Sequence, residues 1–139
     1  MAVESDLRSR IGKLLREHGY MVQSIETGAI AEGVPDLWYS IASGIVTHSG
    51  WLELKKVREM PKKRETSVFK SLNHPLSVEQ ENWIGMAADH GTRVDILVAF
   101  ERDYFFVPGQ YAPKFNSFTQ ADLRKFQVKK DDIPRLLLV

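Results

Sequence analysis

Asp36, Glu53 and Lys55, all in the first half of the chain, have side-chain types and a spacing that suit metal-assisted hydrolysis. Asp36 lies in a segment with strand character, and Glu53 and Lys55 lie two residues apart in the next such segment. Because side chains alternate along a strand, Glu53 and Lys55 project on the same side. If the two segments form a hairpin, Asp36 lies across from Glu53. Mg²⁺ accepts one or two carboxylates, waters and the phosphate oxygens of a substrate, and a neighbouring lysine orients the attacking water.

The same three residues also have an ordinary interpretation. Asp36 then ends a turn, and Glu53 and Lys55 form an exposed pair on a strand. The spacing is permissive, so it does not separate the two interpretations by itself.

Two further polar residues are candidates for the same site. On a helical wheel at 100° per residue, Glu4 shares a stripe with Leu7 and Ile11, where a carboxylate is costly unless it is paired or bound to metal. Its alternative role is a favourable charge at the start of a helix. Gln80 follows Ser77 by three residues, which fits a capping box; it could also reach toward a phosphate or a metal-bound water.

Charge is balanced overall, with 19 Lys and Arg against 18 Asp and Glu, but residues 55–70 hold seven basic residues against two acidic ones, a local charge of +5. Pro61 interrupts this segment and no apolar period runs through it, so we predict a loop or a flexible hairpin. Such a run is either a solvated excursion or an arm that neutralises phosphates beside a site. Its candidate DNA contacts are Lys56, Arg58, Lys62, Lys63 and Arg64.

Apolar spacing and glycines indicate the elements that would position these residues. Leu7, Ile11 and Leu14 recur at helical spacing within residues 3–18, and three short strands separated by glycines favour a meander. These strands are predicted over residues 20–26, 34–41 and 50–57. The later predictions are a helix from Ser77 that ends at Gly91, strands over 93–100 and 104–107, a short helix capped by Thr119, and an apolar tail over 133–139 that forms an edge strand or an oligomer contact.

Length and composition exclude several classes of protein. A chain of 139 residues with 43% hydrophobic residues suits one globular domain over residues 1–139. No run of about 18 apolar residues is present, so no membrane span is predicted, and the first residues lack the apolar core of a secretory signal. The absence of cysteine excludes thiol chemistry and is compatible with the cytoplasm. The G-x-S-x-G and G-K-[ST] patterns are also missing.

The order of these features resembles the PD-(D/E)xK nucleases of the restriction-endonuclease-like superfamily and, within it, the VRR-NUC type. The resemblance covers about residues 4–100; the basic insert is a departure from the pattern, and nothing after Phe100 matches it. The matching features are Glu4 on the first helix, G-V-P-D at 33–36, E-L-K at 53–55, and S-V-E-Q at 77–80 followed by Trp83.

The resemblance implies an α/β fold with a central mixed β-sheet flanked by helices, in which a three-strand meander is followed by a helix and a parallel strand. Lys55 would position the nucleophilic water, and Gln80 would be an auxiliary polar contact. The implied ligands of Mg²⁺ or Mn²⁺ are Asp36, Glu53, the backbone carbonyl of Leu54 and, completing or supporting the metal shell, Glu4.

The implied activity is a Mg²⁺-dependent endonuclease that hydrolyses DNA phosphodiester bonds in Holliday junctions or other branched DNA, similar to phage resolvases. The basic arm at about 56–75 would hold the DNA backbone without reading bases. A homodimer is expected because two strands must be cut symmetrically, with Phe105–Phe106 or the apolar tail as the contact. The expected location is the cytoplasm, that of a bacterial host for a phage enzyme. The alternative is a DNA-binding module that retains the fold without efficient chemistry, which the complete set of Asp36, Glu53 and Lys55 disfavours.

Overall fold

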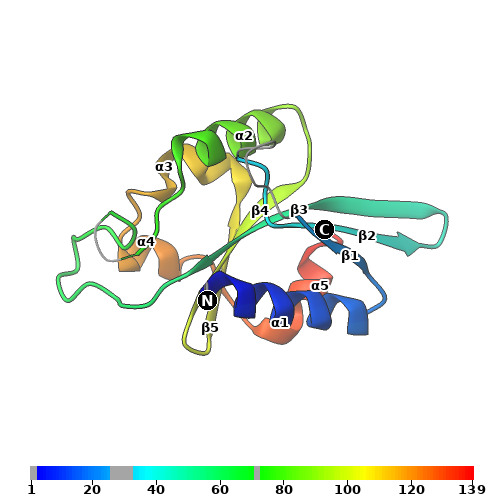
Figure 1. Ribbon diagram of the computed structural model, residues 1–139, viewed down its shortest axis with the longest axis horizontal. Helices are drawn as coiled ribbons and strands as arrows, with labels where there is room; N and C mark the ends of the chain where they lie inside the picture. Colours follow the sequence, from blue (N-terminus) through cyan, green and yellow to red (C-terminus); the bar gives the residue numbers. More distant parts are fainter. Residues whose placement is uncertain (1–2, 26–32, 71–72) are drawn as a thin grey trace.

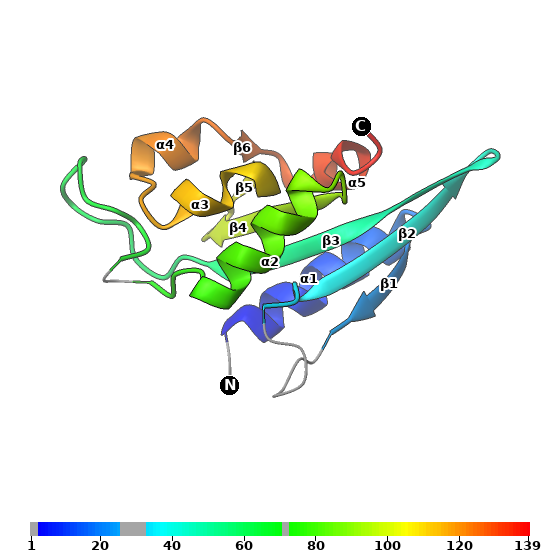
Figure 2. The same cartoon turned by 90° about the horizontal axis from the view of Figure 1, so that it is seen from above.

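A six-stranded sheet forms the middle layer of the molecule, with helices on both faces (Figures 1 and 2). The computed structural model describes residues 3–25, 33–70 and 73–139, with the backbone alone for residues 3–5. The helices are α1 (Val3–Glu17), α2 (Val78–Asp89), α3 (Ala112–Phe115), α4 (Gln120–Arg124) and α5 (Ile133–Leu136). The strands are β1 (Met21–Ser24), β2 (Leu37–Ser43), β3 (Val46–Lys56), β4 (Val94–Phe100), β5 (Asp103–Pro108) and β6 (Gln127–Val128).

The sheet is mixed, and its strands lie side by side in sequence order. β1, β2 and β3 form an antiparallel meander in which Leu37 pairs with Leu52. The chain then crosses over through α2, and β4 pairs parallel to β3, with Glu53 opposite Ile96. β5 and β6 complete the sheet in antiparallel order. The mixed α/β fold predicted from the sequence is therefore confirmed.

Alternation along β3 decides which side chains face each layer of helices. Leu52 and Leu54 are buried in one core cluster with Leu7 and Ile11 of α1. The opposite face of the sheet packs against α2, α3 and α4 around a second cluster that includes Ile84 of α2. Since side chains of neighbouring residues point to opposite faces, the residues between and beyond the two leucines project toward the α2 side.

β2 and β3 continue past their neighbours as a two-stranded ribbon that projects from the body of the molecule (Figure 2). Their pairing extends to Ser43 and Val46, and Gly44 makes the turn in the left-handed region, with φ 65°. Ile45 at the turn is fully exposed. At about 3.3 Å per residue, the turn is roughly 25 Å along β2 from Asp36.

The basic segment is a loop between β3 and α2 that is closed onto the α3–α4 layer. The backbone N–H of Val68 donates to the carbonyl of Phe118 at 2.9 Å, and Phe69 is buried and stacks on Phe115. Asn73 is also buried, accepts from the N–H of Arg58 at 2.7 Å and donates to the carbonyl of Val68 at 2.7 Å. The sequence left open a loop or a flexible hairpin; the structure has an anchored loop.

The structure contradicts one of the two alternatives for the apolar tail and one residue of the expected oligomer contact. The tail does not form an edge strand: Pro134 lies in the first turn of the short helix α5, and Ile133 and Leu137 are buried against the α1 side of the sheet. Phe105 is not available for an oligomer contact, because alternation along β5 turns it into the second core cluster, whereas Phe106 is only half-buried. No helix in the described ranges is both long enough and apolar enough to cross a membrane.

Replacing Asn73 by alanine should destabilise the protein by about 2–4 kcal/mol, because buried backbone groups of the loop lose their partners. Chemical denaturation monitored by circular dichroism measures this change. His74→Ala, at the exposed neighbouring position, is the matched control and should leave the free energy of unfolding within about 0.5 kcal/mol of wild type. Equal stability of the two variants would mean that the Asn73 contacts do not hold the loop.

Candidate active site

The carboxyl group of Asp36 is held beside β3 at the point where the β2–β3 ladder ends. Asp36 lies just before β2 rather than within it, which corrects its expected placement on the strand. The last pair of this ladder is Leu37 with Leu52, so the N–H of Leu54 has no partner on β2. Instead it donates to Oδ2 of Asp36 at 2.8 Å. Asp36 therefore lies next to Glu53 and Leu54.

Glu53 is the buried carboxyl of this site, with only 2% of its surface exposed. Its Oε2 accepts from the side-chain amide of Gln80 at 3.0 Å. Its Oε1 is buried without a hydrogen-bond partner among the described residues. Burial raises the pKa of Glu53 well above its ordinary value, the charge of Asp36 raises it further, and Lys55 and Arg8 oppose this. Burial in this place therefore favours the protonated form of Glu53 over an uncompensated carboxylate.

Lys55 brings a buried ammonium group to the same side of β3. The residue is 7% exposed, and its Nζ lies 3.8 Å from Oε2 of Glu53. It donates to the backbone carbonyl of Pro75 at 3.1 Å and lies 3.4 Å from Oε1 of Gln80. The ammonium group is thus fixed by an acidic strand residue and by the chain that enters α2.

Gln80 has both of the roles that the sequence left open. Ser77 caps α2, and the capping box is complete: the N–H of Gln80 donates to Ser77 Oγ at 3.1 Å, and Ser77 N–H donates to Gln80 Oε1 at 2.9 Å. With Oε1 accepting, the amide nitrogen is free to donate to Glu53. The cap therefore fixes the orientation of the amide that holds the buried carboxylate.

Gly33 explains how the chain before Asp36 reaches this place. Its φ is +86°, and a Cβ added there would lie 2.4 Å from the carbonyl oxygen of Glu79. Only glycine allows this approach in this conformation. The segment that leads to Asp36 thus packs directly on the first turn of α2, which also carries Gln80.

Arg8 is a charged member of the site that the sequence analysis did not select. Its Nη2 lies 2.9 Å from Oδ1 of Asp36, and its buried Nε has no hydrogen-bond partner in the described part of the chain. A signal for it was present: at 100° per residue, Arg8 lies about 40° from Glu4 on the helical wheel, beside the stripe that faces the sheet. With Arg8 and Lys55, the two carboxyl groups are balanced by two cationic side chains.

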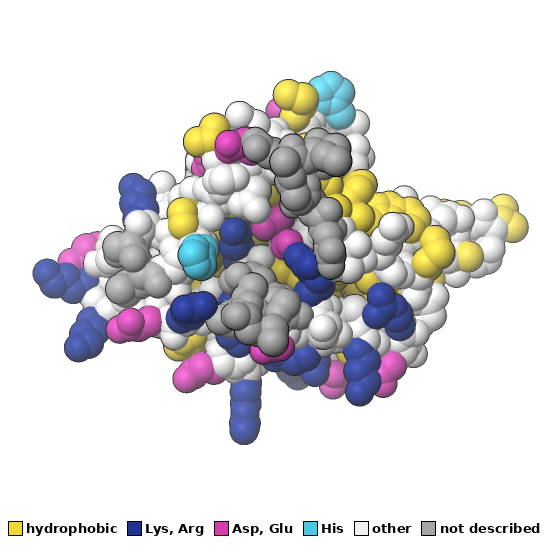
Figure 3. All heavy atoms as spheres, in the orientation of Figure 1, with side chains coloured by type: hydrophobic (Ala, Val, Ile, Leu, Met, Phe, Trp, Pro, Cys, Tyr) yellow, Lys and Arg dark blue, Asp and Glu magenta, His cyan; other side chains and the backbone are white. Residues whose placement is uncertain are grey.

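The other candidates divide into two groups. Glu4 lies in the first turn of α1, and its side chain is not among those that the structure describes. Lys62, Lys63 and Arg64 are exposed on the loop. Figure 3 shows Lys and Arg side chains spread across this face of the molecule, with Asp and Glu among them. Arg58 is exposed and Lys56 half-buried, and alternation along β3 turns Lys56 away from the side of Lys55.

The donors that meet here suit a hard divalent cation. Peptide N–H and C=O groups of one strand residue point to the same edge, so the carbonyl of Leu54 faces the same side as the N–H that Asp36 holds. Two carboxylates and one carbonyl leave room for the waters and phosphate oxygens that Mg²⁺ retains. Within the described ranges, no group of three or more His, Asp or Glu side chains is placed to hold a metal. The free Oε1 of Glu53 is the observation that fits a bound cation.

The fold is similar to that of Hjc, a Holliday junction resolvase from the hyperthermophilic archaeon Archaeoglobus fulgidus. The TM-score is 0.59 at 13% sequence identity, and the match covers 95% of this chain and 98% of that chain. The mixed sheet and its flanking helices therefore match the fold of a resolvase nuclease over nearly the whole length of both proteins. No family model matches the sequence, and the comparison with curated proteins gave no match.

Glu53→Gln should change how stability depends on pH in metal-free buffer. Because the folded-state pKa of Glu53 is raised, the folded protein holds this proton more tightly than the unfolded chain. The free energy of unfolding of the wild type should therefore fall as pH rises above the ordinary pKa of a glutamate, about 4.3. This group contributes at most about 1.4 kcal/mol per pH unit to that fall. The variant should lack this loss and be the more stable protein at pH 8.

Urea denaturation at pH 5 and pH 8 measures this difference. Glu65→Gln, on the exposed part of the loop, is the matched control and should follow the wild-type pH profile. Parallel profiles for wild type and Glu53→Gln would show that the buried carboxyl titrates normally.

Proposed function

We propose that this protein is a divalent-metal-dependent DNA endonuclease that hydrolyses phosphodiester bonds and acts selectively on branched DNA. The observation that carries the proposal is the meeting of Asp36, Glu53 and Lys55 at the end of the β2–β3 ladder, with a free buried oxygen on Glu53. A resolvase-type fold around this set supports it.

Asp36, Glu53 and the carbonyl of Leu54 would hold the cation, which is Mg²⁺ or Mn²⁺. When bound, such an ion lowers the pKa of a water and stabilises negative charge on a phosphate. Lys55 would orient the attacking water, since its ammonium group is fixed beside Glu53. Gln80 would keep Glu53 in place through its amide.

Arg8 gives the site a second cationic group with a distinct task. It neutralises Asp36 in the structure, through the ion pair to Oδ1. A divalent cation on Asp36 would take over that neutralisation, and the guanidinium group would then be available to a phosphate oxygen, which its planar donors suit.

Branched DNA is the proposed substrate because the basic loop offers sequence-independent phosphate contacts beside the site and because the fold resembles that of a Holliday junction resolvase. A homodimer would place two such sites on two strands. The narrower assignments, a VRR-NUC type domain over residues 1–139 and a phage enzyme, rest on the sequence motifs G-V-P-D, E-L-K and S-V-E-Q alone.

The decisive experiment incubates the protein with a labelled four-way junction and with a linear duplex of the same composition. We expect cleavage with Mg²⁺ or Mn²⁺, faster on the junction, and binding without cleavage in Ca²⁺. Asp36→Asn, Glu53→Gln and Lys55→Met should each lower the rate by at least about 100-fold while leaving junction affinity in Ca²⁺ nearly unchanged. Gel electrophoresis of the labelled strands gives both readouts.

Lys129→Met, an exposed lysine on the last third of the chain, is the matched control for Lys55→Met and should cut at the wild-type rate. Junction binding without cleavage under Mg²⁺ and Mn²⁺ would favour the alternative, a DNA-binding module without efficient chemistry. Full cutting by Lys55→Met would remove the ammonium group from the reaction.

The exposed part of the basic loop gives a second prediction. Replacing Lys62, Lys63 and Arg64 together by glutamine should weaken DNA binding at low salt. It should also reduce the slope of log K against log salt by up to about 3, because fewer counterions are released. Fluorescence anisotropy in Ca²⁺ across a salt series measures both quantities. A slope equal to that of wild type would mean that the loop does not contact the phosphates.

A further inference from the structure

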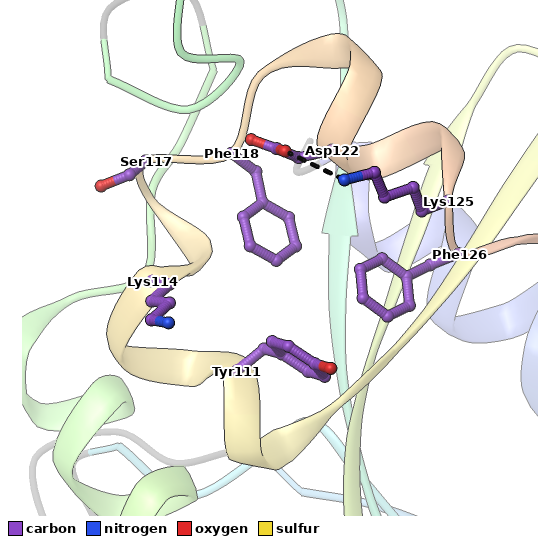
Figure 4. A pocket seen from close by; sticks show the side chains of 7 residues that line it. All are labelled: Tyr111, Lys114, Ser117, Phe118, Asp122, Lys125 and Phe126. Carbon is purple, nitrogen blue, oxygen red and sulfur yellow. Dashed lines mark ion pairs between the residues drawn. The ribbon is translucent and has the colours of Figure 1, made fainter.

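A second concave site lies between α3 and α4, and neither Asp36 nor Glu53 lines it. It is a hollow of about 390 Å³, a volume in the range of small-molecule sites. The rings of Tyr111, Phe118 and Phe126 turn toward it from three sides (Figure 4). Phe118 is buried, whereas Tyr111 and Phe126 are half-buried, so part of their surface is left for a ligand.

The three rings form an aromatic surface of defined shape. Phe118 and Phe126 are parallel to within 3°, with centroids 5.8 Å apart, and Tyr111 stands edge-on to Phe126 at 5.1 Å. A flat ring does not fit between two parallel rings at this spacing. A planar ligand would instead stack on an aromatic face that is turned toward the hollow. Tyr111 bounds one side of that hollow.

The rim of the hollow is cationic. Lys114 and Lys125 lie on it and are exposed. Asp122 also lines it, but its Oδ2 already accepts from the N–H and the hydroxyl of Thr119, at 3.0 and 3.1 Å, in a helix cap. Its Oδ1 lies 4.0 Å from Nζ of Lys125, the ion pair drawn dashed in Figure 4. With two lysines against one carboxylate the rim keeps a net positive charge, and a planar ring that carries phosphate satisfies both the aromatic wall and the rim.

The wall of the hollow is joined to the basic loop by two backbone contacts. Thr119, which caps α4, pairs with Ser67 of the loop as an isolated β-bridge. The N–H of Val68 donates to the backbone carbonyl of Phe118, whose side chain is one of the three rings. The loop therefore packs against the segment that carries Phe118 and Thr119, so a DNA strand whose phosphates lie on the loop would have the hollow beside it.

We propose that the hollow between α3 and α4 binds an unpaired base of a DNA substrate, with the base stacked on the aromatic wall and a flanking phosphate on Lys114, while Lys125 would reach a second phosphate by leaving its ion pair with Asp122. Aromatic platforms with basic borders hold single-stranded DNA without strong sequence preference, because every base has a π-face. This inference rests on the proposed function for its substrate class. It adds a means of recognising branched DNA by its unstacked bases.

The test compares a single-stranded oligothymidylate with an abasic strand of the same length, which keeps the phosphates and lacks the bases. Affinities are measured by fluorescence anisotropy in Ca²⁺. Wild type should bind the base-containing strand about 5-fold to 100-fold more tightly than the abasic strand. Phe126→Leu and Tyr111→Leu should each lose most of this preference, while their affinity for the abasic strand stays the same.

Phe106→Leu, at a half-buried ring on the opposite side of β5, is the matched control and should keep the full preference. Thermal unfolding checks each variant; if Phe126→Leu fails to fold, Tyr111→Leu decides alone. An unchanged preference in a folded Tyr111→Leu protein, as expected if the hollow takes a protein side chain, would overturn the proposal. Because binding in Ca²⁺ requires no cutting, absence of nuclease activity with the preference intact would refute the proposed function and leave this inference standing.

Discussion

The carboxyl group of Glu53 is buried beside that of Asp36, and the rest of the structure is arranged around the electrostatic cost of this pair. Two acidic groups in a low-dielectric environment repel each other and lose hydration. Arg8 and Lys55 supply the compensating charge, and Gln80 supplies one hydrogen bond. Together with the two carboxyl groups, these side chains come from α1, from the residue just before β2, from β3 and from α2. The site therefore exists only when the meander and the crossover helix are both in place.

Two features of local structure beside Asp36 and Glu53 each have a second role at the site. The capping box that begins α2 also orients the amide of Gln80, and the end of the β2–β3 ladder frees the peptide group of Leu54 for Asp36. Gly33 allows the chain to approach α2 closely enough for this geometry. Ordinary ways of beginning a helix and ending a strand thus provide the positions that a hydrolytic site would need.

Period-two alternation and capping chemistry were sufficient to predict much of this arrangement. The common side of Glu53 and Lys55 and the capping box of Ser77 and Gln80 follow from local rules. The parallel strand after α2 was implied by the resemblance to the PD-(D/E)xK nucleases and not by local rules. The start of β3 was predicted four residues too late, because the projecting ribbon from Val46 onward is exposed and has no apolar alternation.

The errors and omissions concern tertiary packing. The sequence predicts an edge strand or an oligomer contact for the tail and a surface position for Phe105, because apolar character alone does not reveal which core a segment enters. Arg8 was not selected, since an arginine on a helix is ordinarily solvated, although its position beside Glu4 on the wheel was readable. The aromatic hollow joins rings from residues 111–126, a region without a recognisable motif, and only the folding of α3 against α4 brings them together.

The hydrogen bond from Lys55 to the carbonyl of Pro75 joins the two ends of the basic loop. This hydrogen bond connects β3, which carries Lys55, directly to the segment that enters α2, independently of the conformation of the outer loop. Lengthening a loop whose ends are already joined costs little conformational entropy. The outer part of the loop could thus be shortened, extended or exchanged as a module. Such a change would alter what the protein binds while the residues at the base of the loop keep their positions.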